Sequence, residues 1–337
     1  MRLLALVESI DHVCCRYRLR AFHDIFNAAG HALEIRPVPR GWRDRLSTFA
    51  AVGRVDVVIL QRRLISPWRL AALRRRARRL IFEFDDAVFM RDSYAVKGSD
   101  SPRRRQRFAA IVRAADAVVA GNEWLADRAE SAGTAGIIRV IPSCIDPVRY
   151  PRAKHSSTSD VRLVWVGSSS TLNGLELVRE MLDAVGAAIP GIRLKLVADR
   201  FPNFGRLPIE AVRWDEPTEA AEIAAADIGI SWVPDDDWSR GKCGLKVLQY
   251  MAAGLPVVAN PVGVHRTMIR HGENGFLART ADEWISAIRR LAGDPELRRR
   301  MGTAGRWQVE GDYSVTAGGR RWLDLLGSLA GARRAAG

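Results

Sequence analysis

Cysteine is scarce in this sequence of 337 residues, and its placement excludes the common cysteine-based sites. None of Cys14, Cys15, Cys144 and Cys243 forms a C-x-x-C pair, and none has a histidine at zinc spacing. Long apolar runs are also missing, because no segment approaches the length that crosses a bilayer. The apolar start, residues 1–13, lacks a small-residue cleavage site and predicts a buried strand rather than a signal peptide. We therefore expect a protein of the reducing cytoplasm without a structural metal.

Acidic residues are too few to balance the basic ones, and the net charge is +14. Residues 1–150 hold 27 Lys and Arg against 16 Asp and Glu, whereas the remaining residues carry a net charge of only +3. The runs LRRRARR (73–79) and PRRRQR (102–107) could meet nucleic acid, anionic lipid or an anionic substrate. No aromatic residues interleave with these arginines, so we expect no nucleic acid partner. Peripheral contact with an anionic membrane and plain solvation of helix faces both stay open.

Short apolar runs alternate with helix-like segments along most of the chain. Strands are expected at 3–7, 55–60, 80–84, 117–121, 138–142, 161–167, 193–199, 227–233 and 256–260. Helices are expected between them, for example at 17–30, which ends in a glycine. Nearly continuous apolar strands separated by helices indicate parallel sheets covered on both faces. The fold class is therefore α/β, with doubly wound, Rossmann-like domains.

A break in this alternation at PRAKHSSTSD (151–160) is the best linker in the chain. We expect an N-terminal, acceptor-side domain over 1–155 and a C-terminal, nucleotide-sugar-binding domain over 156–315. The remaining residues, 316–337, are expected to form a helix that could pack back on the N-terminal domain. Ligands of such folds bind beyond the carboxyl ends of the strands and in the cleft between domains.

The stretch SRGKCGLKVLQYMAAGLPVV (239–258) carries the densest chemistry. Gly244 allows close backbone approach at a helix start, where free N–H groups and the helix dipole attract anions. Lys242 and Lys246 add positive charge, and Gln249 lies one turn further along the helix. From the residues alone, a packed helix start with surface lysines is an equal alternative. We expect a donor-binding segment that includes Cys243, Gly244 and Leu245 besides Lys242, Lys246 and Gln249.

A second phosphate cradle is expected at WVGSSSTLNG (165–174), where a strand turns into a helix at Gly167, Ser168 and Ser169. An ordinary serine N-cap is the alternative. This turn contains no basic residue, so Lys242, Lys246 and Arg200 are the candidates to supply positive charge to a diphosphate.

Two further candidates lie after strands of the first half. In FEFDDAVF (82–89), Asp85 and Asp86 could orient a sugar or acceptor hydroxyl, and one of them could have a raised pKa and assist deprotonation. A capping pair on a loop is the alternative. In ESIDHVCCRYRLR (8–20), Arg16 and Arg18 could hold an anionic acceptor. No third ligand stands near the aspartates in the sequence, so no metal site is expected.

The C-terminal half resembles a known enzyme family. GKCGLKVLQYMAAGLPVVANPVGVH, followed by HGENGFLA and EW, is similar to the signature of family 4 glycosyltransferases, which are retaining enzymes of the GT-B fold. The resemblance implies two Rossmann-like domains facing a central cleft and metal-independent transfer without a cofactor. Relatives usually carry two glutamates flanking seven residues, where this chain has Gly241 and Gln249. A subset with a K-x-x-Q/E-Y-M-A motif is more similar, and there Gln249 would bind the donor ribose.

The resemblance predicts a glycosyltransferase that moves a sugar from a nucleotide-diphosphate sugar to an acceptor hydroxyl. The acceptor could be a cell-envelope glycan, a lipid-linked sugar or a small molecule. Lys246, Asp85 and Asp86 are the expected catalytic residues. The alternatives are a nucleotide-sugar epimerase or phosphorylase on the same fold, and a non-catalytic protein that binds anionic lipid or nucleic acid. The expected location is cytoplasmic, with peripheral attachment to the inner face of the membrane if the basic half binds lipid.

Overall fold

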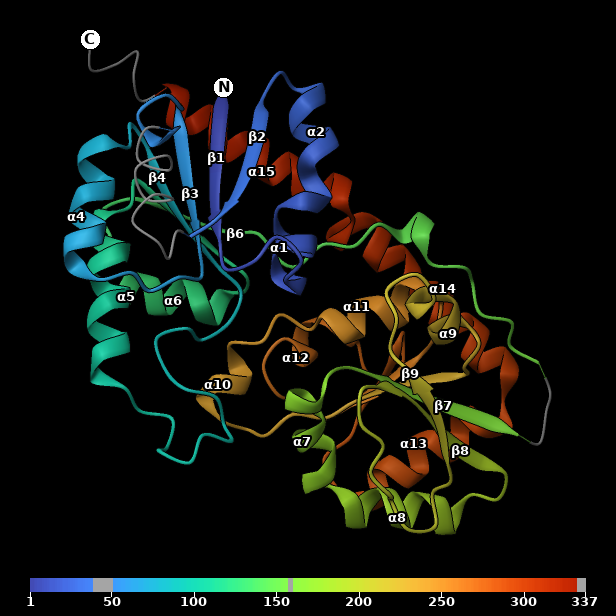
Figure 1. Cartoon of the computed structure of the whole chain (residues 1–337). Coiled ribbons are helices and arrows are strands. Elements are labelled where there is room, and N and C mark those ends of the chain that lie inside the picture. Colours follow the sequence, from blue (N-terminus) through green and yellow to red (C-terminus); the bar gives the residue numbers. More distant parts are fainter. Residues whose placement is uncertain (39–50, 157–159, 332–337) are drawn as a thin grey trace. The chain divides into compact units, whose positions relative to one another are not determined.

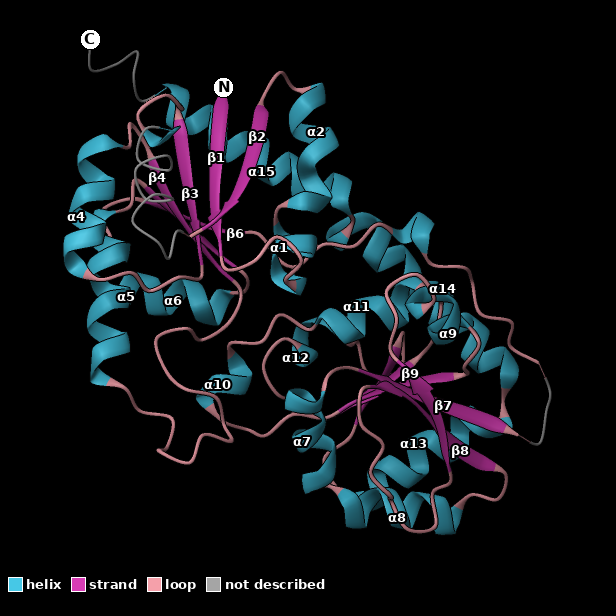
Figure 2. Cartoon of the chain, in the orientation of Figure 1, coloured by secondary structure: helices cyan, strands magenta, loops and turns pink. Residues whose placement is uncertain are grey.

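The computed structural model describes residues 1–38, 51–156 and 160–331, which form two compact units (Figure 1). Unit 1 consists of Met1–Cys144, Asp236–Cys243 and Val315–Gly337, and unit 2 of Ile145–Asp235 and Gly244–Ser314. Strands and helices alternate through most of the chain (Figure 2). No helix within the described ranges is long and apolar enough to cross a membrane.

Unit 1 is built on a six-stranded parallel sheet in the order β2-β1-β3-β4-β5-β6. The strands are β1 (Arg2–Val7), β2 (Ala32–Pro37), β3 (Val57–Gln61), β4 (Leu80–Phe84), β5 (Ala117–Ala120) and β6 (Ile137–Val140). The helices are α1 (Val13–Arg18), the 3₁₀ turn η1 (Arg20–Phe22), α2 (His23–Ala28), α4 (Pro67–Arg76), α5 (Pro102–Ala114), α6 (Glu123–Ser131), α10 (Asp237–Arg240) and α15 (Val315–Gly331).

Both faces of this sheet are buried, which explains the nearly continuous apolar strands. On β1, Leu4 and Leu6 belong to the core on one face, whereas Leu3, Ala5 and Val7 belong to the core on the other. Successive strand residues point to opposite faces, so apolar residues at every position imply a covered sheet. Parallel pairing requires crossover connections, which the helices between the strands supply.

Unit 2 repeats the architecture with a second parallel sheet in the order β12-β11-β10-β7-β8-β9. Its strands are β7 (Val161–Val166), β8 (Ile192–Ala198), β9 (Ile209–Arg213), β10 (Ile228–Ser231), β11 (Val257–Ala259) and β12 (Gly275–Leu277). Its helical elements are η2 (Pro147–Arg149), α7 (Ser169–Leu177), α8 (Arg179–Ala188), α9 (Glu219–Ala224), α11 (Leu245–Ala252), α12 (His265–Met268), α13 (Ala281–Gly293), α14 (Pro295–Gln308) and the π-helical turn η3 (Val309–Tyr313).

The units differ from the expected domains in two segments. Unit 2 begins at Ile145, so residues 145–155 belong to it and not to the expected first domain. Residues 236–243 were assigned to the second domain by their place in the sequence, but they pack with unit 1. The amide of Asn122 donates to the carbonyl oxygens of Arg240 and Lys242, at 3.2 and 3.1 Å. Cys243 is buried, and its Sγ donates to the carbonyl oxygen of Asp85 at 3.1 Å. These hydrogen bonds to Asn122 and Asp85 attach residues 236–243 to unit 1.

The C-terminal helix α15 belongs to unit 1, where Trp322 packs against Phe22 and Phe26. Two expected helices are broken in the structure. The segment 17–30 divides into α1, η1 and α2, and the helix expected after Gly167 divides at Val178 into α7 and α8. Residues 157–159 of the expected linker and 332–337 of the expected terminal helix lie outside the described residues.

Candidate functional site

The order of the strands in unit 2 reverses between β7 and β10, and open α/β sheets bind ligands beyond the carboxyl ends of the strands at such a point. Gly167 directly follows β7, and the exposed Ser168 and Ser169 begin α7. A Cβ atom at position 167 would lie 2.7 Å from both Thr171 Oγ1 and the Trp165 ring. Only glycine therefore fits this turn without displacing its neighbours.

Lys246, in the first turn of α11, reaches this turn after β7. Its Nζ donates to Thr171 Oγ1 at 3.3 Å and lies 4.8 Å from the centre of the Trp165 ring. Its Cε would be 2.9 Å from a Cβ atom on Gly167. The structure thus brings together Lys246 and the Gly167–Ser169 turn, which are 77 residues apart at their closest in the sequence.

Two helices begin in this region. At α7, Asp199 accepts hydrogen bonds from the side chain and the backbone of Ser169, which lowers the pKa of Asp199 and compensates the positive end of this helix. Neither Ser168, the N-cap of α7, nor Gly244, the N-cap of α11, makes a side-chain capping hydrogen bond, and neither helix has an acidic residue in its first turn. Gly244 adopts φ +65°, and a Cβ there would lie 2.6 Å from Met268 Sδ. Leu245 follows it as the first residue of α11. Helix N-termini and a lysine amine together favour an anion such as a phosphate.

A neutral histidine lies near this lysine. His265 is buried, with Nδ1 2.9 Å from the Asn260 carbonyl oxygen and Nε2 3.1 Å from Ser231 Oγ. Because a carbonyl oxygen only accepts, Nδ1 carries the proton and Nε2 accepts from the serine hydroxyl. Burial lowers the pKa of His265 to about 4, and the positive charge of Lys246 acts in the same direction. His265 therefore adds no charge to the anion site at neutral pH.

Two expected donor-binding residues have protein partners in the structure. Gln249 is buried, and its amide nitrogen donates to Tyr150 Oη at 3.2 Å; that it binds the donor ribose stays a prediction. Arg200 is exposed, but its Nη2 pairs with Glu176 Oε2 at 2.7 Å. Its charge is therefore largely compensated on α7.

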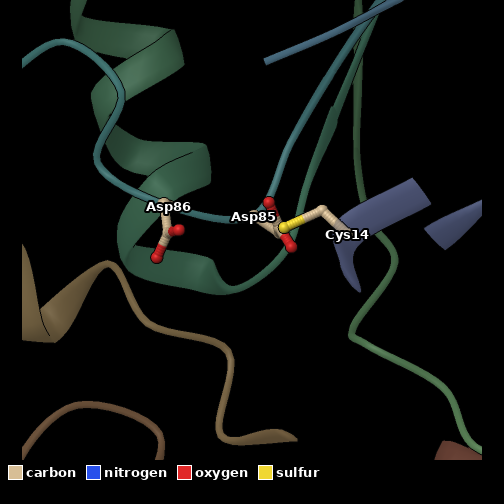
Figure 3. Close-up of side chains that lie close together, drawn as sticks. All are labelled: Cys14, Asp85 and Asp86. Atoms are coloured by element: carbon tan, nitrogen blue, oxygen red, sulfur yellow. The ribbon is translucent and has the colours of Figure 1, made fainter. Parts of the chain in front are cut away.

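A second cluster occupies unit 1, where the strand order reverses between β1 and β3. Arg62 directly follows β3, Asp85 and Asp86 follow β4, and Cys14 lies in α1 after β1. Arg62 Nη1 donates to Cys14 Sγ at 3.0 Å, to Asp86 Oδ2 at 2.7 Å and to Asp85 Oδ1. Figure 3 shows the side chains of Cys14, Asp85 and Asp86 close together.

Burial and neighbouring charges determine the protonation states of Asp85 and Cys14 in this cluster. Burial disfavours the ionised form of Asp85, but the charges of Arg62 and Arg18 outweigh it and hold the pKa of Asp85 below its usual range. The expectation that one aspartate assists deprotonation through a raised pKa does not hold for Asp85. Burial, helped by Asp85, raises the pKa of Cys14, so this residue is a neutral thiol. The ionised Asp85 carboxylate can therefore accept hydrogen bonds from hydroxyl groups.

Arg18 forms part of the interior beneath this cluster rather than an acceptor site. It is 2% exposed, and its Nε donates to Glu83 Oε1 at 2.7 Å while Nη1 donates to the Ile141 carbonyl oxygen at 2.6 Å. Burial raises the pKa of Glu83 against the attraction of Arg18. Arg18 cannot reach an acceptor because its guanidinium is enclosed by the protein. Arg16 is only partly buried, and its guanidinium lies 4.8 Å from the centre of the Tyr17 ring.

Packing within unit 1 explains why position 241 holds a glycine where the resemblance predicts a glutamate. A Cβ atom on Gly241 would lie 2.9 Å from both the backbone nitrogen and Cβ of Ala87. Gly241 adopts a helical φ of −73°, so space rather than backbone conformation requires glycine. Next to it, Lys242 Nζ lies 5.4 Å from the centre of the Trp238 ring. No side chain fits at position 241 while the Asp86–Ala87 backbone stays where it is.

Arg62 is the site residue that the motifs did not reveal. Its sequence signal is weak: QRR (61–63) directly follows the strand-like run 55–60, at the edge of the sheet where ligands bind. Without the fold, Arg62 is one of many arginines in the basic half, and nothing in the sequence pairs it with Asp85 or Asp86.

Comparison with known proteins gives these two sites a context. Residues 148–294 match the family model Glycosyl transferases group 1. A trehalose synthase of Pyrococcus horikoshii is 36% identical over 88 residues, which are 26% of this chain and only 21% of that protein. The lipopolysaccharide core biosynthesis glycosyltransferase LpsE of Rhizobium meliloti is 26% identical over 245 residues, 68% of each protein.

Solved structures extend the likeness to the whole chain. Sucrose-phosphate synthase of Thermosynechococcus elongatus has a TM-score of 0.73 at 16% identity, over 98% of this chain and 100% of that one. HepE of Anabaena, in complex with UDP and glucose, has a TM-score of 0.68 at 15% identity, over 97% of this chain and 100% of that one. These likenesses show the fold, two Rossmann-like domains of the GT-B type.

Proposed function

We propose that the chain is a retaining glycosyltransferase whose donor is a nucleotide-diphosphate sugar. The observation that carries the proposal is the anion site of unit 2, where Lys246 Nζ lies beside the Gly167 turn and α11 begins with no acidic residue in its first turn. A diphosphate fits this chemistry because helix N-termini and an amine together neutralise negative charge. The HepE structures, one with UDP and glucose and another with UDP-glucose, support the choice of donor.

In the proposed reaction, the bond between the sugar's anomeric carbon and the diphosphate oxygen breaks while the acceptor oxygen attacks from the same face. The leaving diphosphate takes the proton of the acceptor hydroxyl. Lys246 and the N–H groups at the start of α11 stabilise the negative charge that develops on the leaving group. The positive charge of these groups is what a metal ion would otherwise supply, so we propose that transfer is metal-independent.

The aspartates of unit 1 are proposed to hold a hydroxyl of the reacting sugar or the acceptor. Asp85 is ionised and accepts hydrogen bonds, and Asp86 is the more exposed of the two, with 22% of its side chain accessible against 10% for Asp85. Positioning of this kind lowers the barrier by converting an encounter into a reaction between oriented groups.

Lys246→Ala tests this proposal. We expect UDP to raise the melting temperature of the wild type, because a ligand of the native state stabilises it. The variant should bind UDP roughly 10–100-fold more weakly, the loss expected when a charge-assisted phosphate contact disappears. The measurement is thermal shift against UDP, with turnover of UDP-glucose measured in parallel. Lys154→Ala removes an exposed lysine elsewhere in unit 2 and is the matched control. Equal UDP affinity of Lys246→Ala and wild type would exclude Lys246 from the site.

Peripheral contact with an anionic membrane is a further part of the proposal. Trp68 and Arg69 at the start of α4, with Arg103 and Arg107 at the start of α5, form what we call the α4–α5 basic patch. Trp68 is 58% exposed, and neither helix has an acidic residue in its first turn. Burial and the neighbouring charges of Arg103 and Arg69 lower the pKa of Arg107, which shows that these arginines are close together. Anionic headgroups and an interfacial tryptophan suit such a patch.

A further inference from the structure

Arg62 has a backbone conformation that asks for an explanation. Among the described residues it is the one non-glycine residue with a positive φ, +57°. The conformation is fixed by a hydrogen bond from Arg62 N to the Glu83 carbonyl oxygen, at 2.8 Å. A side chain with a Cβ atom is disfavoured in this left-handed region, and such outliers persist where the surroundings hold them, often at functional sites. Glycine would relieve the backbone strain at position 62. The presence of arginine instead indicates that its side chain has a role there.

The contacts of the Arg62 side chain indicate why an arginine is present at this position. Cys14 Sγ and one carboxylate oxygen each from Asp85 and Asp86 lie within 4.8 Å of one another, a spacing suited to one cation (Figure 3). Thiol and carboxylate groups in such a set are ligands for a divalent metal. Here the cation is part of the chain, because Arg62 Nη1 donates to all three residues. The Arg62 side chain is only 15% exposed and is therefore not a mobile surface charge.

We propose that Arg62 is a positioning residue that takes the place of a metal ion and fixes the carboxylates of Asp85 and Asp86 toward a substrate hydroxyl. The hydroxyl-binding role rests on the proposed function. Without Arg62, two neighbouring carboxylates would repel each other and rotate toward solvent or other partners. With it, Asp85 is tied down and the more exposed Asp86 keeps a defined orientation from which to accept a hydrogen bond.

Two substitutions separate this role from a merely structural one. Arg62→Gly removes the side chain and suits the positive φ, so the backbone gains no strain. Arg62→Lys keeps a positive charge. All three contacts come from a single nitrogen, and an ammonium with three donors can replace it. The UDP-induced thermal shift is the folding control, since the nucleotide site is proposed in unit 2, whereas Arg62 belongs to unit 1.

In UDP-glucose turnover, we expect Arg62→Gly to lower kcat about 100-fold, the scale of a lost positioning contact, with UDP affinity unchanged within about twofold. Arg62→Lys should recover kcat to within about tenfold of the wild type. Wild-type kcat in Arg62→Gly, or no recovery in Arg62→Lys, would overturn the positioning role. If the wild type binds no UDP and turns over no UDP-glucose, the proposed function fails instead.

A metal titration tests, independently of activity, whether Arg62 occupies the position that a metal ion would take. We expect Co²⁺ to give a thiolate-to-metal absorption band with Arg62→Gly, because the three ligands are then open to a metal. The wild type should show no band, and the double variant Arg62→Gly/Cys14→Ser should lose it. A band in the wild type, or none in Arg62→Gly, would refute the idea that Arg62 takes the place of a metal ion.

Discussion

At the scale of single residues, packing leaves no space for a side chain at position 241, where the resemblance to family 4 glycosyltransferases predicts a glutamate. The glutamate expected at position 241 is replaced by glycine, and the neighbouring backbone nitrogen and Cβ of Ala87 would be only 2.9 Å from any Cβ there. A carboxylate is not simply missing from an open site, because the loop that carries Asp85 and Asp86 fills the space.

Restoring the glutamate should consequently be harmful. We expect Gly241→Glu to destabilise the protein by about 1–3 kcal/mol, as overpacking of an interior does, and to give no increase in UDP-glucose turnover. Urea unfolding and a turnover assay provide the two measurements. The comparison variant is Gly327→Ala in α15, where a Cβ would meet nothing within 4 Å and stability should stay equal or rise. A stable and more active Gly241→Glu would show that the Ala87 loop does not restrict this position.

At the scale of elements, a buried histidine that links α12 to the ends of β10 and β11 makes the stability of the protein depend on pH. His265, at the start of α12, joins Ser231 at the end of β10 to Asn260 after β11. Its pKa is about 4 in the folded protein, because burial and Lys246 oppose protonation, against about 6.5 when unfolded. Only the unfolded chain binds this proton between the two values, so stability is complete above pH ~6.5 and falls toward pH ~4.

This linkage predicts a loss of about 2 kcal/mol of unfolding free energy between pH 7 and pH 5 from His265 alone. Urea unfolding at the two pH values measures the loss. His265→Gln keeps one donor and one acceptor but does not titrate, so its stability should change less over the same interval. The same pH dependence in the variant and the wild type would mean that His265 is not the responsible group.

The elements also show which features could be predicted from the sequence. The strands β1, β3, β4, β7 and β8 are confirmed because most of their residues are apolar and buried. The strands β2, β9 and β12 were missed, and all three lie at sheet edges. β2 and β9 carry charged, partly exposed residues, and β12 has only three residues.

The candidate sites divide in the same way. The Gly167 turn and Lys246 belong to a motif with local chemistry, and the structure brings them together. Arg62 could not be predicted, because its partners lie in α1 and in the loop after β4 and meet it only in the folded chain. The burial of Arg18 and Gln249 was also out of reach, since neither residue type is usually interior.

At the scale of the whole molecule, charge is concentrated in one half of the sequence, with 27 Lys and Arg among residues 1–150. Many of these arginines are compensated, as Arg74 is by Asp116 and Arg62 by the aspartates. The α4–α5 basic patch is an exception in its crowding of like charges. A surface of this kind steers anionic partners, and its effect weakens as salt increases.

We therefore expect the protein to sediment with vesicles of phosphatidylcholine and phosphatidylglycerol but not of phosphatidylcholine alone. Arg69→Glu/Arg103→Glu should weaken binding at least about tenfold, since each basic residue near an anionic surface contributes about 1 kcal/mol. The control, Arg213→Glu/Arg300→Glu, makes the same charge change on exposed residues of unit 2. Equal losses for the two double variants would indicate a general charge effect and exclude the patch as the docking surface.

The membership of α15 in unit 1 has a consequence for how the protein is made. Unit 2 ends at Ser314, whereas unit 1 needs α10 and the terminal helix, whose Trp322 is fully buried against Phe22 and Phe26. On the ribosome, the unit whose first strand is synthesised first is therefore completed last. Until Trp322 emerges, the apolar surface around Phe22 stays uncovered. We therefore expect the nascent chain to need a chaperone most during the time before α15 is synthesised.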